Sequence, residues 1–116
     1  VWSAERLAAA AAAAAPRLAA AGFTPSFVAP ATTNAGRALP YIAPLWEQEP
    51  LRGTVTELSY HRYGGADAET IAAIGAWGRT RGVPTAMLEH IGSAADALHE
   101  DLTSGNVSAW EQFALS

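Results

Sequence analysis

The feature that most constrains this chain is a regular alternation of helical and strand-like segments joined by connections of a few residues. Four segments carry the caps, spacing or stops of helices, and four are short, apolar and rich in β-branched or aromatic residues. The predicted helices cover residues 3–22, 35–48, 67–82 and 93–105, and the predicted strands cover residues 26–33, 54–63, 85–88 and 107–115. This alternation predicts an α/β fold with parallel strands joined by right-handed crossovers.

Local signals mark the ends of the helices. Ser3 can cap the alanine-rich first helix, which Pro16 should kink and Gly22 should stop. Pro40 and Pro44 predict that the second helix is short or broken. The later helices have N-caps at Asp67 and Ser93 and stops at Gly82 and Gly105.

Composition narrows the classes of function. The chain has 116 residues, 50% of them hydrophobic and 16% charged, which fits one domain or a piece of one. Its net charge of −4 and scattered arginines argue against nucleic acid as a partner, and the absence of cysteine excludes thiolate metal sites. The apolar run 7–15 resembles the core of a signal peptide, but Trp2 and Glu5 do not fit such a leader, and Pro16-Arg17 interrupts the run before it could span a membrane.

Four strand–helix units in this length predict a partial (β/α)8 TIM barrel, about half of the ~250 residues of a full barrel. The chain is then a single segment, residues 1–116, forming one half of a barrel. An open sheet covered by helices on both faces is the alternative, although no glycine-rich phosphate loop follows any predicted strand.

In such barrels the chemistry lies at the carboxyl ends of the strands, and alternation decides which side chains face the interior. The predicted inner face consists of Glu57, Ser59 and His61, of Thr85, Met87 and Glu89, and of Ser108, Trp110 and Gln112. Leu58, Tyr60, Ala86 and Leu88 are predicted to face the helices. The rim of the barrel would carry His61, Glu89, Trp110 or Gln112, and Thr33 and Asn34.

Glu89 is the most informative of these residues, because it ends an apolar strand with a carboxylate. An acid at a barrel mouth, next to an imidazole and an aromatic ring, suits attack on an anomeric carbon. A second interpretation is that Glu89 lies near the N-terminus of the next helix and interacts with its dipole. Trp110 likewise has two interpretations, a ring that stacks on a sugar and an ordinary core aromatic.

Short motifs along nearly the whole chain resemble the clan A glycoside hydrolases, most closely family 30, the glucosylceramidase and xylanase group. ELSYHRYGG, PTAMLEHIG and LHEDLTSGNVSAWEQFAL resemble the sixth, seventh and eighth barrel strands of that family. The opening VWSAERLAAAAAAAAPRLAAAGFTPSFVAPATTN is similar to the helix after strand four together with strand five.

The resemblance implies a retaining mechanism in which Glu89, the glutamate of TAMLE, is the nucleophile. His61 would contact the active site and Trp110 would stack on a sugar. Tyr63, Asn34 and Gln112 are the further expected substrate contacts. The resemblance implies a carbohydrate substrate, no cofactor and no metal, and a secreted protein.

One departure from the family pattern affects catalysis. The Asn-Glu-Pro motif that carries the general acid does not occur, and Gln48-Glu49-Pro50 is predicted to be a connecting turn. The general acid is therefore expected upstream of Val1, and the chain alone should be weakly active or inactive. Its expected partner is the missing N-terminal half barrel or a second copy. The rival hypothesis is a non-catalytic sugar-binding or assembly domain.

Two further expectations concern acidic residues. Glu57 within a strand is costly unless it is paired, either with Arg62 or with a group of the missing half. Residues 99–101, His-Glu-Asp, are expected to form a solvated helix face.

Overall fold

A computed structural model describes residues 2–92 and 95–113 of the chain. In this part, four helices alternate with four strands, as the sequence predicts. The helices are α1 (Ala4–Ala20), α2 (Ala38–Glu47), α3 (Ala68–Arg81) and α4 (Ala95–Thr103). The strands are β1 (Phe27–Thr32), β2 (Val55–His61), β3 (Thr85–Glu89) and β4 (Val107–Trp110). Two short 3-10 turns, η1 (Ala35–Arg37) and η2 (Glu49–Leu51), precede and follow α2.

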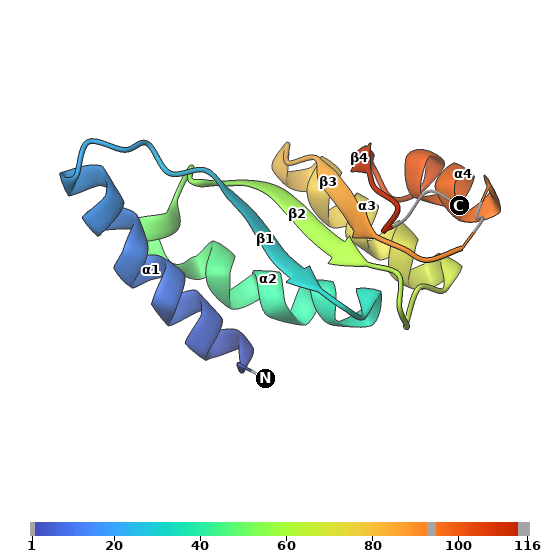
Figure 1. Ribbon diagram of the computed structural model, residues 1–116, viewed down its shortest axis with the longest axis horizontal. Helices are drawn as coiled ribbons and strands as arrows, with labels where there is room; N and C mark the ends of the chain where they lie inside the picture. The colour runs from blue at the N-terminus through green and yellow to red at the C-terminus, as the bar shows by residue number, and fades with distance from the viewer. Residues whose placement is uncertain (1, 93–94, 114–116) are drawn as a thin grey trace.

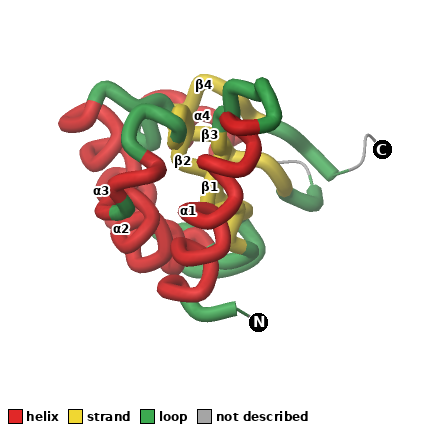
Figure 2. The backbone as a smooth tube through the Cα atoms, turned by 90° about the vertical axis from the view of Figure 1, so that its left-hand side faces the viewer, coloured by secondary structure: helices red, strands yellow, loops and turns green. Residues whose placement is uncertain are grey.

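The strands form one parallel sheet in the order β1-β2-β3-β4 (Figure 1). Because strands that follow each other in the chain are also neighbours in the sheet, crossovers of one hand carry every helix to the same face. Figure 2 shows α2 and α3 lying to the same side of the strands. The core joins sheet residues such as Leu58 and Met87 to α1, α2 and α3. In the described part of the chain the alternative of an open sheet with helices on both faces is therefore wrong.

The caps predicted at Ser3 and Asp67 and the stop predicted at Gly82 agree with the structure. The Ser3 side chain accepts from the Arg6 backbone N–H (3.4 Å), and the Asp67 side chain accepts from Thr70 (2.8 Å). Gly82 ends α3 in the left-handed conformation, with φ of 67°. The predicted N-cap at Ser93 lies outside the described residues.

Two predicted elements have different bounds in the structure. The proline-rich segment after β1 divides into η1 and α2, with Pro44 inside α2. The last strand ends at Trp110, so the prediction of a strand as far as residue 115 is wrong for residues 111–113. The remainder of that prediction falls on residues 114–115, which are not described.

The alternation predicted for β2 is confirmed. Leu58 and Tyr60 lie in the core beneath the helices. Glu57 and Ser59 face the other way: the Ser59 hydroxyl accepts from the Ala31 N–H (3.0 Å), and Glu57 accepts from Ser108. This face without helices is called the open face below.

The alternation predicted for β3 is wrong over most of its length. Met87 belongs to the core, and the Thr85 hydroxyl donates to the Gly105 carbonyl (2.6 Å) in a buried position. Met87 is the register partner of Tyr60, and Glu89 is the register partner of His61, so the pairing skips Leu88. This irregularity shifts the alternation by one residue and brings Glu89 to the open face.

The prediction that Ser108 and Trp110 share a face in β4 is also wrong. The Ser108 hydroxyl donates to a Glu57 carboxylate oxygen (2.6 Å) on the open face. The Trp110 indole N–H donates to Asp101 (2.9 Å) on the helix side. A second register irregularity, at the pairing of Thr85 and Ala86 with β4, separates the two side chains.

Asp101 of α4 is the centre of a buried polar cluster, and the expectation of a solvated face is wrong for this residue. Its side chain is 0% exposed and accepts from the Tyr60 hydroxyl (2.6 Å), Arg62 (2.7 Å) and Trp110. Arg62 also bonds Glu100 (2.8 Å), so it does not pair with Glu57. Burial, together with the hydrogen bond to Asp101, raises the pKa of Tyr60 well above its ordinary value.

Both edges of the sheet lack a neighbouring strand among the described residues, because β1 and β4 each pair on one side only. Pro30 lies within β1 and removes one backbone donor from that strand. None of the helices in residues 2–92 and 95–113 has the length and apolar character that crossing a membrane requires.

The Asp101 cluster predicts unequal effects of two neighbouring substitutions. Asp101→Ala should lower the free energy of unfolding by about 3 kcal/mol or more, because it leaves Arg62 and two other donors without their buried acceptor. Glu100→Ala, which removes a partly exposed partner of the same Arg62, should cost about 1 kcal/mol or less. Urea unfolding followed by circular dichroism measures both, and equal costs would contradict the central role of Asp101.

Candidate functional site

Glu89, His61 and Tyr63 meet at the carboxyl ends of β2 and β3, and these three residues are called the Glu89 cluster below. The Tyr63 hydroxyl donates to Glu89 Oε1 at 2.7 Å. His61 Nδ1 lies 3.6 Å from Glu89 Oε2, with side chains that are 17% and 32% exposed, respectively. Both carboxylate oxygens therefore have a partner, and the carboxylate still reaches solvent.

Backbone hydrogen bonds hold the members of the Glu89 cluster in place. Beyond the end of β2, the Arg62 N–H donates to the Glu89 carbonyl (3.1 Å), and the Tyr63 N–H donates to the Thr33 carbonyl (3.2 Å). The His61 and Tyr63 rings meet edge to face, with centroids 6.1 Å apart and planes at 74°. The ends of three strands thus fix the position of one carboxylate.

The hydrogen bond to Glu89, with smaller contributions from desolvation and the carboxylate charge, raises the pKa of Tyr63 to about 12. The cause is that a phenolate beside a carboxylate is disfavoured, whereas a neutral phenol donates to it. Tyr63 therefore remains a hydrogen-bond donor at neutral pH.

Asn34 has a structural function in the turn after β1. Its Oδ1 accepts from the Gly36 N–H (2.9 Å), and it caps η1. The neighbouring Ala35 N–H donates to the Gly64 carbonyl (2.8 Å), which ties this turn to the loop after β2. The left-handed Gly65, with φ of 59°, lies so close to Asn34 that a side chain at that position would clash with the amide.

The structure does not bring Trp110 into the Glu89 cluster. The indole is on the helix side with Asp101, edge to face with His90 at a centroid distance of 6.3 Å. The prediction that Trp110 shares a face with Glu89 is therefore wrong. The position of the indole favours the interpretation of Trp110 as an ordinary core aromatic. The Gln112 amide donates to the Gly92 carbonyl (3.2 Å), in the loop after β3.

A hollow of about 710 Å³ lies at the carboxyl end of β1. Its lining includes Trp2, Thr33, Arg37 and Tyr41, from the start of α1, the end of β1 and the start of α2. The Tyr41 hydroxyl donates to the Trp2 carbonyl (2.8 Å) and holds one wall. The Thr33 carbonyl also accepts from the Tyr63 backbone N–H, which links one lining residue of this hollow to the chain of the Glu89 cluster.

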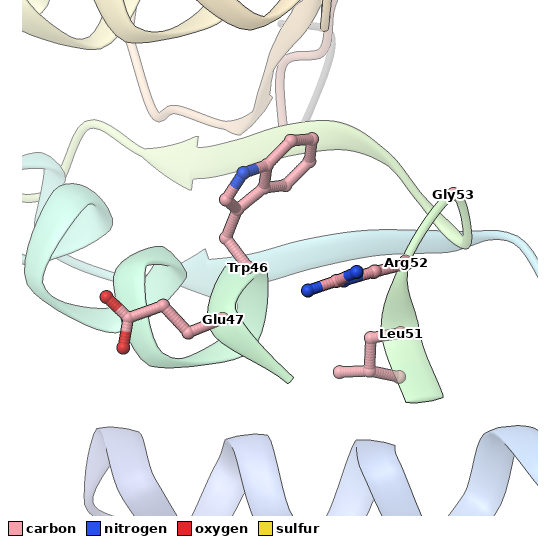
Figure 3. A pocket seen from close by; sticks show the side chains of 5 residues that line it. All are labelled: Trp46, Glu47, Leu51, Arg52 and Gly53. Carbon is pink, nitrogen blue, oxygen red and sulfur yellow. The ribbon is translucent and has the colours of Figure 1, made fainter. Parts of the chain in front are cut away.

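A second hollow, of about 560 Å³, lies at the opposite end of the sheet, where the chain passes from α2 into β2 (Figure 3). Trp46, Glu47, Leu51, Arg52 and Gly53 line it. It is remote from Glu89 along the strands, since these residues precede β2 and His61 ends that strand.

The described residues contain no group of three or more histidine or acidic side chains that could hold a metal ion. Comparisons with known proteins find no matching family model, curated protein or solved structure.

Sequence reasoning identified Glu89 and His61 as neighbours but missed the bond that holds the carboxylate. Tyr63 follows the end of β2, and alternation from His61 would have placed its side chain on the same face as Glu89. That signal was present in the sequence, because the predicted alternation also placed His61 and Glu89 on one face.

The raised pKa of Tyr63 predicts the effect of neutralising its partner. Glu89→Gln should return the pKa of Tyr63 from about 12 towards its ordinary value of 10.0, because the carboxylate charge and its preference for a neutral donor are lost. A pH titration of the tyrosine Cζ carbons by NMR measures this, with Tyr63→Phe to assign the signal. Glu57→Gln is the matched control and should leave the titration unchanged; an unchanged titration in Glu89→Gln would show that the bond does not form in solution.

Proposed function

We propose that this chain is the nucleophile-bearing part of a retaining glycoside hydrolase, and that Glu89 attacks the anomeric carbon of a carbohydrate substrate. The observation that carries the proposal is the position of Glu89. It is a partly exposed carboxylate at the carboxyl end of a parallel strand, with one oxygen bonded to Tyr63 and the other facing His61. Nucleophilic catalysis needs a group held in this way by its neighbours.

The fold supports the proposal through the order of its strands. Parallel strands in sequential order, with the helices on one face, form the repeating unit of a (β/α)8 barrel. We interpret the chain as half of such a barrel. The open face would then become the barrel interior, and the Glu89 cluster would lie at the end where barrel enzymes carry their chemistry.

In the proposed first step, a Glu89 oxygen forms a bond to the anomeric carbon while the bond to the leaving oxygen breaks. The leaving oxygen takes a proton from a general acid, and water then hydrolyses the glycosyl ester in the second step. Tyr63 holds and orients the carboxylate through Oε1, and His61 faces Oε2. The hollow at the carboxyl end of β1, with the aromatic side chains of Trp2 and Tyr41, would receive further sugar units of the substrate.

The general acid must come from outside the sequence given. Retaining enzymes place two carboxyl groups about 5–5.5 Å apart, and the chain contains no Asn-Glu-Pro motif to supply the second. The free edges of β1 and β4 are where a complementary half barrel, or a second copy of this chain, would add its strands. Full turnover is expected only in that assembly.

The alternative function is a non-catalytic carbohydrate-binding or assembly domain derived from a barrel. The missing acid motif favours it, because binding needs no second carboxylate. Covalent attachment of a sugar to Glu89 is expected of the hydrolase and not of the binding domain.

A substrate with an activated leaving group tests Glu89 without the general acid. A 2-deoxy-2-fluoroglycosyl fluoride needs no protonation of its leaving group, because fluoride departs as the anion when Glu89 bonds to the anomeric carbon. We expect slow, saturable addition of one fluorosugar to Glu89, detected by peptide mass spectrometry after incubation with gluco- and xylo-configured reagents.

Glu89→Gln should abolish the labelling, and Glu57→Gln, which removes the other carboxylate of the open face, should retain it. Tyr63→Phe should slow labelling by about tenfold, the effect of losing one positioned hydrogen bond to a charged group. Labelling of another residue, or none by either reagent after a complementary half barrel has been added, would refute the nucleophile.

A further inference from the structure

The hollow at the start of β2 has the size and the lining of a small-ligand site. Its volume of about 560 Å³ lies within the roughly 300–1,000 Å³ typical of such sites. It combines an indole (Trp46), an aliphatic side chain (Leu51), a carboxylate (Glu47) and a guanidinium (Arg52). Figure 3 shows the Arg52 side chain directed towards Trp46, and the Glu47 side chain extending from α2 in the direction away from Arg52.

The backbone around this hollow is well fixed. Leu51 is 2% exposed, and its carbonyl accepts both the backbone N–H (2.9 Å) and the hydroxyl (2.8 Å) of Thr54. The Arg52 N–H donates to the Glu49 carbonyl (3.2 Å), and Gly53 turns the chain with φ of 72°. The hollow is therefore formed before any ligand binds, which reduces the entropy lost on binding.

Trp46 is supported from behind by a second aromatic ring. The Trp46 and Trp77 rings meet edge to face, with centroids 5.2 Å apart and planes at 78°. The Arg81 guanidinium lies over the Trp77 ring, 4.6 Å from its centroid. The indole at the hollow is thus held in one orientation by neighbours that do not line the hollow themselves.

The charges at the hollow are available to a ligand. Glu47 and Arg52 are exposed, and neither forms an ion pair with another residue of the described part. One acid and one base leave the lining without net charge, so it favours a neutral ligand with both donors and acceptors. A guanidinium offers only donors and an ionised carboxylate only acceptors, so the two are complementary to hydroxyl groups.

We propose that this hollow is a second carbohydrate-binding site, separate from the Glu89 cluster, that holds one sugar unit of a neutral glycan. The apolar face of the sugar packs on Trp46, its hydroxyls accept from Arg52, and they donate to Glu47. The choice of a sugar rests on the proposed function, whereas the hollow and its lining do not. Such a site keeps a polymeric substrate on the protein while its reacting bond lies at the other end of the sheet.

NMR titration of the ¹⁵N-labelled chain with cellotriose and xylotriose tests this site. We expect a saturable shift of the Trp46 indole N–H signal with at least one of the two sugars. Arg52→Ala should weaken that binding about tenfold, since it removes a charged hydrogen-bond donor. Arg17→Ala, an exposed arginine on α1, is the matched control and should leave the affinity unchanged.

The outcomes separate this site from the proposed function. Binding at Trp46 that persists in Glu89→Gln supports the site even if no fluorosugar labels Glu89. Shifts confined to residues around Tyr63 would overturn the site and leave the nucleophile untouched. A response of the Trp46 signal to free leucine equal to that for the sugars would overturn the carbohydrate assignment. Arg52 is exposed, so its variant reports on binding without disturbing the core.

Discussion

The buried carboxylate of Asp101 determines how the end of β2 is presented. Tyr60 and Arg62, on either side of His61, both bond Asp101 beneath the sheet. Because alternate side chains of an extended segment face opposite ways, His61 and Tyr63 are directed to the open face. The same carboxylate holds Trp110 of β4, so a single acidic residue of α4 ties two strand ends to the helix layer. A buried charge of this kind is costly, and three donors around it offset that cost.

Glu89 reaches the same face by a different route. Regular alternation along β3 would place it with Met87 in the core, where an unpaired carboxylate is unfavourable. The register skips Leu88, so Glu89 becomes the partner of His61 instead. Irregularities of this type are common next to functional sites because they redirect one side chain without changing the sheet. The Glu89 cluster therefore depends on Asp101 for one strand and on a local irregularity for the next.

The sequence was sufficient for features that local chemistry determines. The alternation of elements, the caps at Ser3 and Asp67 and the stop at Gly82 follow from propensity and short-range hydrogen bonds. The sequence could not predict which side chains of β3 and β4 face the helices, because alternation assumes an unbroken register. The burial of Asp101 could not be predicted either. An acid within His-Glu-Asp is typical of a solvated helix face, and the donors that bond Asp101 come from strands distant in the chain.

The bond between Tyr63 and Glu89 has different consequences in the two halves of the proposed reaction. A donor on a carboxylate lowers its intrinsic nucleophilicity, so Tyr63 assists the attack only by holding the carboxylate in position. In the second half the carboxylate is the leaving group, and a donor on Oε1 stabilises the charge that returns to it. Tyr63 is protonated at neutral pH even at its ordinary pKa of 10.0, so it supplies this hydrogen bond without giving up its proton. The arrangement thus favours release of the sugar over its capture, and capture would have to be driven by binding energy from the hollow beside Thr33.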